Sequence, residues 1–259
     1  MKTIKFPLIL IILASAFCAF GETQNKKKLV IAGDDWCPYN CRQGAKDEGF
    51  LVELARKAFY IYGIDVEYRV MSWSQALEEV SMGNIDAIFG VSNPNISKLV
   101  STKLPIEYSI SRAYTKEGSS WIYDGIGSLR GKKLGIILDY EVDESINQYI
   151  GSNYAKYPSL FAIEEGVDAV AKSINNLNNK QIEVFIEDER VVKYYTKNMN
   201  LTENIKNAGR VSKVKLPIYI AFSSKTNDVK KYISRLEEGI ASLKATGEYN
   251  DLRRKYDMD

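Results

Sequence analysis

The sequence predicts an α/β protein with two lobes, each a mostly parallel sheet flanked by helices, and a cleft between the lobes. Runs of strand length alternate with segments of helical period over residues 29–91, and the same alternation returns over residues 133–197. Strand-like passages at residues 104–127 and 211–223 join the two halves. We therefore expect the chain to cross between the lobes twice and to leave a cleft, which is a favoured place for a ligand.

The first half of the chain has the order β-α-β-α-β, which is typical of a parallel sheet with right-handed crossovers. A helix beginning at Gly49 is predicted by apolar residues at helical spacing, and it ends at Gly63. The next helix begins with the capping box from Ser72 to Gln75 and is stopped by Gly83. The predicted strands cover residues 29–32, 65–71 and 85–91.

The second half repeats this order with different residues. It ends in one long helical stretch over residues 227–256, which we expect to pack on the first lobe. The expected boundaries are a signal peptide over residues 1–21, the first part of lobe 1 over 22–112, lobe 2 over 113–217 and the C-terminal part of lobe 1 over 218–259. The predicted elements are strands at 133–138, 160–163 and 182–186 and helices at 141–150, 167–177 and 188–197.

The first residues have the pattern of an export signal. Two lysines precede a nearly continuous apolar run over residues 8–20, and small residues stand at the cleavage position near Gly21. A retained membrane anchor is the alternative, although the run is shorter than the ~20 residues that a spanning helix needs. Cys18 follows the bulky Phe17, so we do not expect it to carry a lipid.

Charge and composition exclude several classes of function. The 259 residues contain 35 Lys and Arg against 33 Asp and Glu, and the basic residues are scattered. Nucleic acid is therefore not an expected partner, because phosphate binding needs a clustered basic surface. The sequence contains no histidine, which excludes histidine-dependent triads and histidine-ligated metal sites. We expect neither a metal nor a cofactor.

A loop over residues 33–41 follows the first predicted strand and carries two carboxylates, two aromatic rings and a proline. Ligands of open α/β sheets bind at the carboxyl ends of strands, so we interpret this segment as a ligand-binding loop, with an ordinary βα connection as the alternative. After signal removal only Cys37 and Cys41 remain, in a compartment that permits disulfides, and we expect them to pair. Zinc is the competing interpretation, but two thiols alone make a poor zinc site.

Several short segments stand in a characteristic order along nearly the whole chain. They are residues 29–34, Pro38-Tyr39, Gly49-Phe50, Trp73, Gly83, residues 85–88 and 90–92, residues 129–135, residues 243–249 and Lys255-Tyr256. Together they resemble the family 3 extracellular solute-binding proteins of bacterial ABC importers, which have the type 2 periplasmic-binding fold. The resemblance implies a periplasmic monomer that traps a small solute, commonly an amino acid, between its lobes. Its implied partner is a membrane permease or a sensor protein.

The same resemblance implies which residues hold the ligand. In the second lobe, Asp188 matches the carboxylate that usually holds an α-ammonium group. Each aromatic residue of the first lobe could instead be a core or surface ring. The first-lobe residues implied are Asp34, Trp36, Tyr39, Trp73, Gly90 and Ser92.

Two departures from the family pattern concern the ligand carboxylate. Members that bind amino acids usually carry an arginine after the Gly-x-Ser element, where it holds the carboxylate in a bidentate pair, but residues 92–98 contain none. The Gly-Thr opening of the second lobe's first helix, an anion-binding nest, is replaced by Asp139 and Tyr140. Either Lys98 or Arg112 takes over this role, or the ligand is not an ordinary α-amino acid.

The acidic and aromatic residues of the expected cleft suggest a positively charged ligand. Carboxylates around aromatic faces hold ammonium and guanidinium groups. We therefore expect a cationic or amine-bearing solute with no strict need for an α-carboxylate. The alternative is that several of these acids face solvent or cap helices, as Asp188 could at its helix start. The acids are Asp34, Asp35, Asp139, Glu187 and Asp188, and the aromatic residues are Trp36, Tyr39 and Tyr140.

An enzyme is the main rival from another class, because a few relatives with this fold are extracytoplasmic dehydratases acting on cyclic acids. Such catalysis would need an acid with a tuned pKa, for which Glu187 or Asp34 could serve, and an anion clamp. The clamp is what this sequence lacks, so we predict a binding protein that is not an enzyme. A sensory partner without a transport role is a third interpretation.

Overall fold

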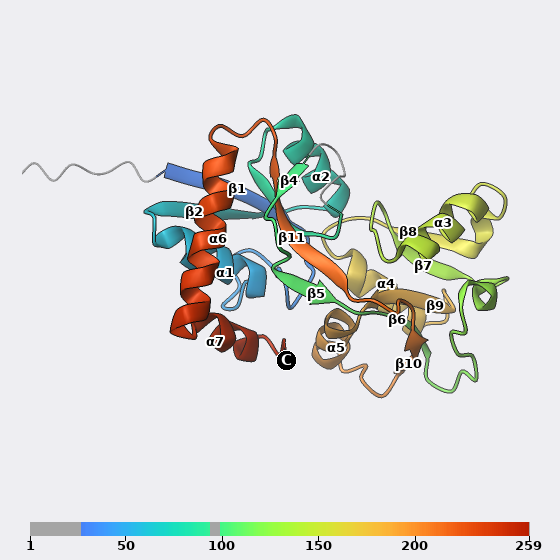
Figure 1. Ribbon diagram of the computed structural model, residues 1–259. Coiled ribbons are helices and arrows are strands. Elements are labelled where there is room, and N and C mark those ends of the chain that lie inside the picture. The colour runs from blue at the N-terminus through green and yellow to red at the C-terminus, as the bar shows by residue number, and fades with distance from the viewer. Residues whose placement is uncertain (1–26, 94–98, 259) are drawn as a thin grey trace, which may run out of the picture.

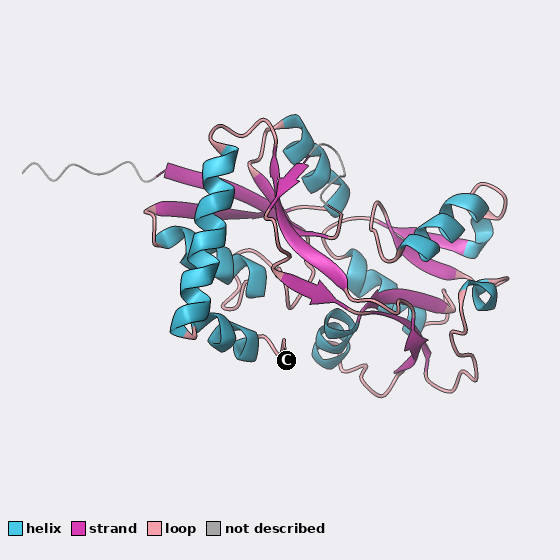
Figure 2. Cartoon of the chain, viewed as in Figure 1, coloured by secondary structure: helices cyan, strands magenta, loops and turns pink. Residues whose placement is uncertain are grey.

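The computed structural model describes residues 27–93 and 99–258. The predicted signal peptide over residues 1–21, with Cys18, lies outside the described residues, as does Lys98. The described chain folds into two lobes, each made of strands with helices packed around them (Figures 1 and 2).

The first lobe is built from both ends of the described chain. Its N-terminal elements are β1 (Lys27–Gly33), α1 (Phe50–Tyr60), β2 (Ile64–Val70), α2 (Trp73–Met82), β3 (Ala87–Val91), β4 (Leu99–Ser101) and β5 (Glu107–Ser109). Its C-terminal elements are β11 (Leu216–Ser223), α6 (Val229–Thr246) and α7 (Glu248–Lys255).

The second lobe contains everything between these two parts. Its strands are β6 (Ser111–Lys116), β7 (Leu134–Ile137), β8 (Phe161–Glu164), β9 (Val184–Asp188) and β10 (Ile205–Arg210). Its helices are α3 (Glu144–Asn153), α4 (Ala169–Asn178) and α5 (Glu189–Asn198), with 3₁₀ turns at Ile126–Leu129 and Pro158–Leu160.

Each sheet has the predicted parallel core and is extended by antiparallel strands. In the first sheet, with the order β2-β1-β3-β11-β4, β1 is parallel to β2 and β3, while β11 is antiparallel to β3, β4 and β5. In the second sheet, with the order β10-β6-β9-β7-β8, β7 is parallel to β8 and β9, while β6 is antiparallel to β9 and β10. The repeated βαβ units thus place the carboxyl ends of β1, β3, β7 and β9 toward the space between the lobes.

The chain crosses between the lobes at two adjacent places. Only Ile110 separates β5 of the first sheet from β6 of the second, and residues 211–215 lead from β10 back to β11. The two passages lie together because Leu216 pairs with Ser109. Such a pair of short connections is suited to act as a hinge.

Several helix boundaries differ from the sequence prediction, and three of the differences have a clear local cause. The single helical stretch expected over residues 227–256 is wrong, because Gly247 has a left-handed φ of 88° that ends α6 and starts α7. Helix α3 begins at Glu144 because Asp143 caps it, accepting a hydrogen bond from the Ser145 amide. Strand β9 extends through Asp188, so α5 starts at Glu189.

The C-terminal helix α6 packs on the first lobe, as predicted, and lies across α1 (Figure 1). The two helices approach closely at Gly239, where an added Cβ would lie 2.5 Å from the carbonyl oxygen of Ala58. Only glycine permits this approach. The contact fixes the first sheet and its loops between α1 and α6 on one face and α2 on the other.

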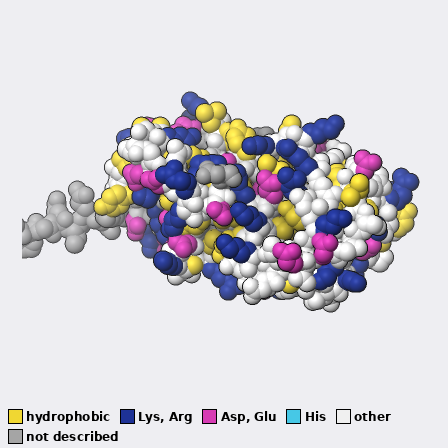
Figure 3. Space-filling view, turned by 90° about the horizontal axis from the view of Figure 1, so that it is seen from below, with side chains coloured by type: hydrophobic (Ala, Val, Ile, Leu, Met, Phe, Trp, Pro, Cys, Tyr) yellow, Lys and Arg dark blue, Asp and Glu magenta, His cyan; other side chains and the backbone are white. Residues whose placement is uncertain are grey.

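No helix in the described part of the chain is long and apolar enough to cross a membrane. One face of the molecule shows basic and acidic side chains interspersed, with apolar side chains between them (Figure 3). On that face no basic surface of the kind that binds nucleic acid is present.

Candidate functional site

A cavity lies between the two lobes, where the ends of β1, β3 and β9 come together. Its volume is about 60 Å³, and residues from both lobes line it. The structure thus gathers side chains that are far apart in the sequence into one place. Of the residues predicted from the sequence, those that line the cavity are Asp34, Trp36, Trp73, Gly90, Ser92, Tyr140 and Glu187.

Asp34 and Trp36 enter the cavity from the loop after β1, which turns back on itself. The Trp36 amide donates to the Asn40 carbonyl oxygen at 2.7 Å, and the Trp36 ring stacks on Tyr39 with 4.2 Å between the ring centroids. Asn40 Nδ2 donates to the carbonyl oxygen of Asp34 at 2.8 Å and to its Oδ1 at 3.3 Å. Asn40 therefore fixes the direction of Asp34, a role that the sequence did not reveal.

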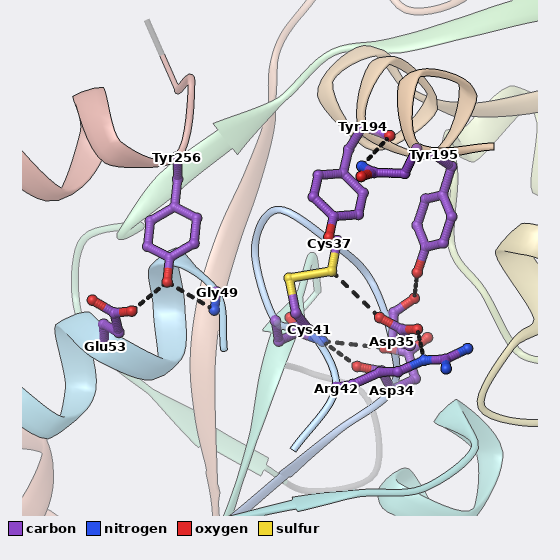
Figure 4. Close-up of a disulfide and its surroundings, with 12 residues drawn as sticks. Asp34, Asp35, Cys37, Cys41, Arg42, Gly49, Glu53, Tyr194, Tyr195 and Tyr256 are labelled. Carbon is purple, nitrogen blue, oxygen red and sulfur yellow. Dashed lines mark hydrogen bonds and ion pairs between the residues drawn. A yellow bond between two sulfur atoms is a disulfide. The ribbon is translucent and has the colours of Figure 1, made fainter. Parts of the chain in front are cut away.

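The predicted disulfide between Cys37 and Cys41 closes this loop, with the two Cα atoms 4.7 Å apart (Figure 4). Beside it, Arg42 Nε donates to Asp35 Oδ2 at 3.1 Å. Tyr195 of α5 donates its hydroxyl hydrogen to the Asp35 carbonyl oxygen at 2.5 Å. Asp35 does not line the cavity, and the loop is held from the second lobe as well as by its own disulfide.

Gly90, near the end of β3, brings bare backbone to the wall of the cavity. Its φ of 84° is in the left-handed region, which glycine adopts without strain. A Cβ added there would lie 3.5 Å from the Trp36 ring. The Trp36 ring and the backbone of Gly90, which no side chain covers, therefore lie next to each other.

Hydrogen bonds join the two lobes around the cavity. They pair side chains of the first lobe with the loop after β7 and with the end of β9, so the structure has the lobes in contact. The Tyr140 hydroxyl reaches across the cleft and occupies one carboxylate oxygen of Asp34. The pairs are Trp36 Nε1 with Glu187 Oε1 at 3.1 Å, Trp73 Nε1 with the Asp139 carbonyl oxygen at 3.0 Å, Ser92 Oγ with Glu141 Oε2 at 3.4 Å, and Tyr140 OH with Asp34 Oδ2.

Asp34 and Glu187, two of the carboxyl groups that line the cavity, are buried, and within the described residues neither forms an ion pair with Lys or Arg. Burial raises the pKa of Asp34 to about 6, although hydrogen bonds from Tyr140 and Asn40 oppose the shift. Burial likewise raises the pKa of Glu187 to about 8, with the nearby charges of Asp188 and Asp34 adding to the effect. Both groups would ionise more readily beside a positive charge.

Tyr39 and Asp188 lie behind the cavity rather than in its wall. The Tyr39 hydroxyl donates to Asp188 Oδ2 at 3.1 Å and accepts from Arg190 Nη1 at 3.1 Å. Asp188 also accepts from the amides of Arg190 and Val191, so it caps α5, as the alternative interpretation of this residue held. Neither side chain is among those that line the cavity.

Arg112 and Asp139 also do not line the cavity. Arg112 Nε, on β6, donates to Glu189 Oε2 at 2.6 Å. The Asp139 side chain is exposed, although its backbone oxygen bonds to Trp73. In this structure Arg112 therefore lies outside the cavity and is paired with a carboxylate of its own lobe.

Several lining residues were not predicted. Glu141 follows Tyr140 in the loop after β7, and Ser109 and Ser111 flank the crossing at Ile110. The start of β11, at residues 216–218, closes the floor of the cavity. The only sequence signal for Ser109, Ser111 and residues 216–218 was their place in the two passages between the lobes, and for Glu141 it was the position next to Tyr140.

The arrangement can bind a cation but offers no metal site. Across residues 27–93 and 99–258, no group of Cys, Asp and Glu side chains is disposed to hold a metal ion. Carboxylates and aromatic rings at the edge of one small cavity provide charge and π faces for an organic cation.

Comparison with known proteins gives a family and a fold. The model of the family described as bacterial extracellular solute-binding proteins, family 3, matches residues 29–258. No curated protein matches the sequence.

Solved structures of similar fold include receptors and a sensor. A histidine kinase sensor domain with similarity to periplasmic binding proteins has a TM-score of 0.75 and 22% identity, covering 90% of this chain and 97% of the other. An ancestral arginine-binding protein bound to arginine has a TM-score of 0.73 and 18% identity, with coverages of 88% and 97%. An arginine-, lysine-, histidine-binding protein from Geobacillus stearothermophilus has a TM-score of 0.70 and 17% identity, with coverages of 90% and 96%. At these identities the likeness extends to the fold.

Proposed function

The chain belongs to the bacterial extracellular solute-binding proteins of family 3, and we propose that it traps a small cationic or amine-bearing solute in the cleft between its lobes. One observation carries this proposal. Three carboxyl residues, Asp34, Glu141 and Glu187, line the cavity together with aromatic rings, and none of the described lining residues is Lys or Arg.

A positive charge is what this cavity lacks. Glu187 Oε1 accepts hydrogen bonds from Trp36 and from the Asp188 amide, whereas within the described residues its Oε2 accepts none. An ammonium or guanidinium group placed there would pair with the carboxylate and lie against the Trp36 or Trp73 ring. Each cation–π contact contributes ~0.5–2 kcal/mol, depending on desolvation.

Within the residues that the structure describes, an α-carboxylate in the cavity has no evident partner. Burying a ligand carboxylate unpaired costs on the order of 3–5 kcal/mol, and the Glu187 and Asp34 carboxyls would repel it. Arg112 is engaged by Glu189 outside the cavity. A protein of similar fold was solved with arginine bound, and arginine carries a cationic group of the kind that we propose for the solute.

The expected setting is outside the cytoplasm, with the loaded protein delivering its solute to an ABC permease and performing no chemistry on it. The sensor domain of similar fold favours a second role, in which closure on the solute is read by a signalling partner. Radiolabelled solute uptake by cells with and without this gene separates the two roles. Loss of uptake supports transport, and unchanged uptake supports sensing.

Calorimetry on two variants, one with a substitution in the cavity and one with a substitution outside it, tests the class of ligand. Agmatine, the decarboxylated form of arginine, is titrated into the mature protein and into its Glu187→Gln and Arg112→Ala variants. We expect Glu187→Gln to weaken agmatine binding by tenfold or more, because it removes the unpaired charge at nearly constant volume. Arg112→Ala serves as the matched control, since Arg112 lies outside the cavity, and it should change the affinity by less than threefold.

The opposite pattern would defeat the proposal. If Arg112→Ala abolishes binding while Glu187→Gln leaves it intact, the site is an ordinary amino-acid site with a relocated clamp.

A further inference from the structure

A second hollow opens beside the cleft, under helix α3. It lies among α3, β7 and β8, with Leu77 of α2 at its edge, and its volume is about 610 Å³. We call it the α3 hollow. Its wall is mostly apolar and includes Ile136, Ile150, Tyr154 and Ile163.

The hollow exists because α3 covers its sheet incompletely. Ile146 is the only buried residue of the ten in this helix. Ile163 of β8 is 39% exposed and Tyr154 is 41% exposed. Apolar side chains left open together on one concave surface are typical of a binding site.

The α3 hollow adjoins the cleft cavity. Tyr140, Glu141, Val142 and Glu187 line both. Glu187 is only 5% exposed, and its Oε2 has no hydrogen-bond donor within the described residues. The Glu187 carboxyl group therefore belongs to the lining of both the small cavity and the larger, mostly apolar one.

The two volumes differ in what they can hold. Sites for small organic ligands usually measure roughly 300–1,000 Å³. The cleft cavity, at about 60 Å³, has room for a charged head group, whereas the α3 hollow, at about 610 Å³, has room for a whole alkyl chain or aromatic ring.

We propose that the solute is an amphipathic amine, whose cationic group binds at Glu187 and whose alkyl or aromatic arm lies in the α3 hollow. This rests on the proposed function, since it assigns the class of solute for the same cleft. Charge complementarity with Glu187 sets the orientation of the amine, and the apolar wall of the α3 hollow favours an alkyl or aromatic arm.

A series of amines of increasing length tests this. Ethylamine, butylamine, hexylamine and phenethylamine are titrated calorimetrically into the mature protein. Transfer of one methylene group from water to an apolar site strengthens binding about fourfold. We expect affinity to rise by about that factor for each added methylene, with phenethylamine far tighter than ethylamine.

A variant that fills the hollow provides the second arm of the test. Gly151 of α3 lines the hollow, and a Cβ added there meets no heavy atom within 4 Å. The first carbon of the side chain in Gly151→Leu therefore meets no clash, and leucine favours a helix more than glycine does. It should lower the ratio of hexylamine to ethylamine affinity at least tenfold. Gly151→Ala, which adds a methyl group only, is the control and should change this ratio by less than threefold.

The outcomes separate this inference from the proposed function. If all four amines bind with equal affinity, or if Gly151→Leu leaves the ratio unchanged, the α3 hollow is not part of the solute site, although the cationic cleft stands. If no amine binds at millimolar concentration, both proposals are wrong.

Discussion

Glu187 combines deep burial, a pKa raised to about 8 by that burial, and a place in the wall of the cleft. The groups near it are the carboxyls of Asp34 and Asp188, the Trp36 indole and the Tyr140 hydroxyl, and its register partner on β6 is Arg112. The Arg112 guanidinium is paired with Glu189. In the ligand-free protein, most Glu187 side chains are therefore protonated at neutral pH, and a bound cation must displace that proton.

This protonation predicts a pH dependence of binding. Each pH unit below a group's pKa costs a tenfold factor when only its ionised form binds. Agmatine affinity should therefore fall about tenfold per unit from pH 8 to pH 6, and more steeply below about 6, where Asp34 is also protonated. Calorimetry at several pH values, in buffers of different ionisation enthalpy, also measures the proton released. An agmatine affinity that is constant or higher at low pH would contradict this prediction. The Glu187→Gln variant should lose the dependence of agmatine affinity on pH above pH 6.

At this scale the sequence identified the kinds of residue better than their positions. It pointed to both Glu187 and Asp188, yet successive residues of a strand face opposite sides. In β9 this alternation turns Glu187 into the cavity and Asp188 back to cap α5. The sequence also did not show which of Trp36 and Tyr39 faces the cavity, because the two rings stack in a loop whose shape the sequence does not reveal.

Among the elements, the disulfide loop after β1 contributes Asp34 and Trp36 to the first-lobe wall. The Cys37–Cys41 link closes a very short loop, for which the chain-entropy estimate gives about 2 kcal/mol. A double Cys37→Ser, Cys41→Ser variant should lose about that much free energy of unfolding in urea. It should also bind agmatine several-fold more weakly, because Asp34 and Trp36 are then held less firmly. Equal affinity of the variant and the parent would show that the loop is fixed by its hydrogen bonds alone.

The contact between α1 and α6 gives a second prediction about elements. Gly239→Ala should lower the free energy of unfolding by about 1–3 kcal/mol, because its Cβ would overlap the backbone of Ala58. Gly151→Ala in α3 is the matched control, since its Cβ enters open space, and it should raise stability by about 0.5–1 kcal/mol. Thermal unfolding followed by circular dichroism compares the two. Stabilisation by both substitutions would mean that the helices separate without cost.

Periodicity predicted the existence and order of the helices and strands, because apolar spacing reports which face is buried. It missed the break at Gly247 because the apolar pattern continues through it, and the glycine's left-handed conformation is a backbone property. It began α3 too early because Val142 is apolar, while the capping Asp143 sets the true start.

Across the whole molecule, several hydrogen bonds join the two lobes, among them those between Trp36 and Glu187 and between Tyr140 and Asp34, while two short passages connect the lobes. A solute that contacts both lobes adds to these bonds, so its binding shifts the population toward closure. Small-angle scattering should show a smaller radius of gyration with saturating agmatine than without it. An unchanged radius would indicate that the lobes are already closed before binding.

The two α/β lobes and the double crossing between them were predicted from the sequence. The close approach of the lobes was not, because it depends on contacts between side chains from both lobes.

The proposed function requires that the cleft recognises a positive charge and has no place for an α-carboxylate. Its most direct test is the ratio of dissociation constants for agmatine and arginine, measured by calorimetry on the mature protein at pH 8. We predict that agmatine binds at least a hundredfold more tightly than arginine, because a buried, unpaired carboxylate costs on the order of 3–5 kcal/mol. Arginine binding at micromolar strength, with agmatine binding more weakly or not at all, would contradict the claim.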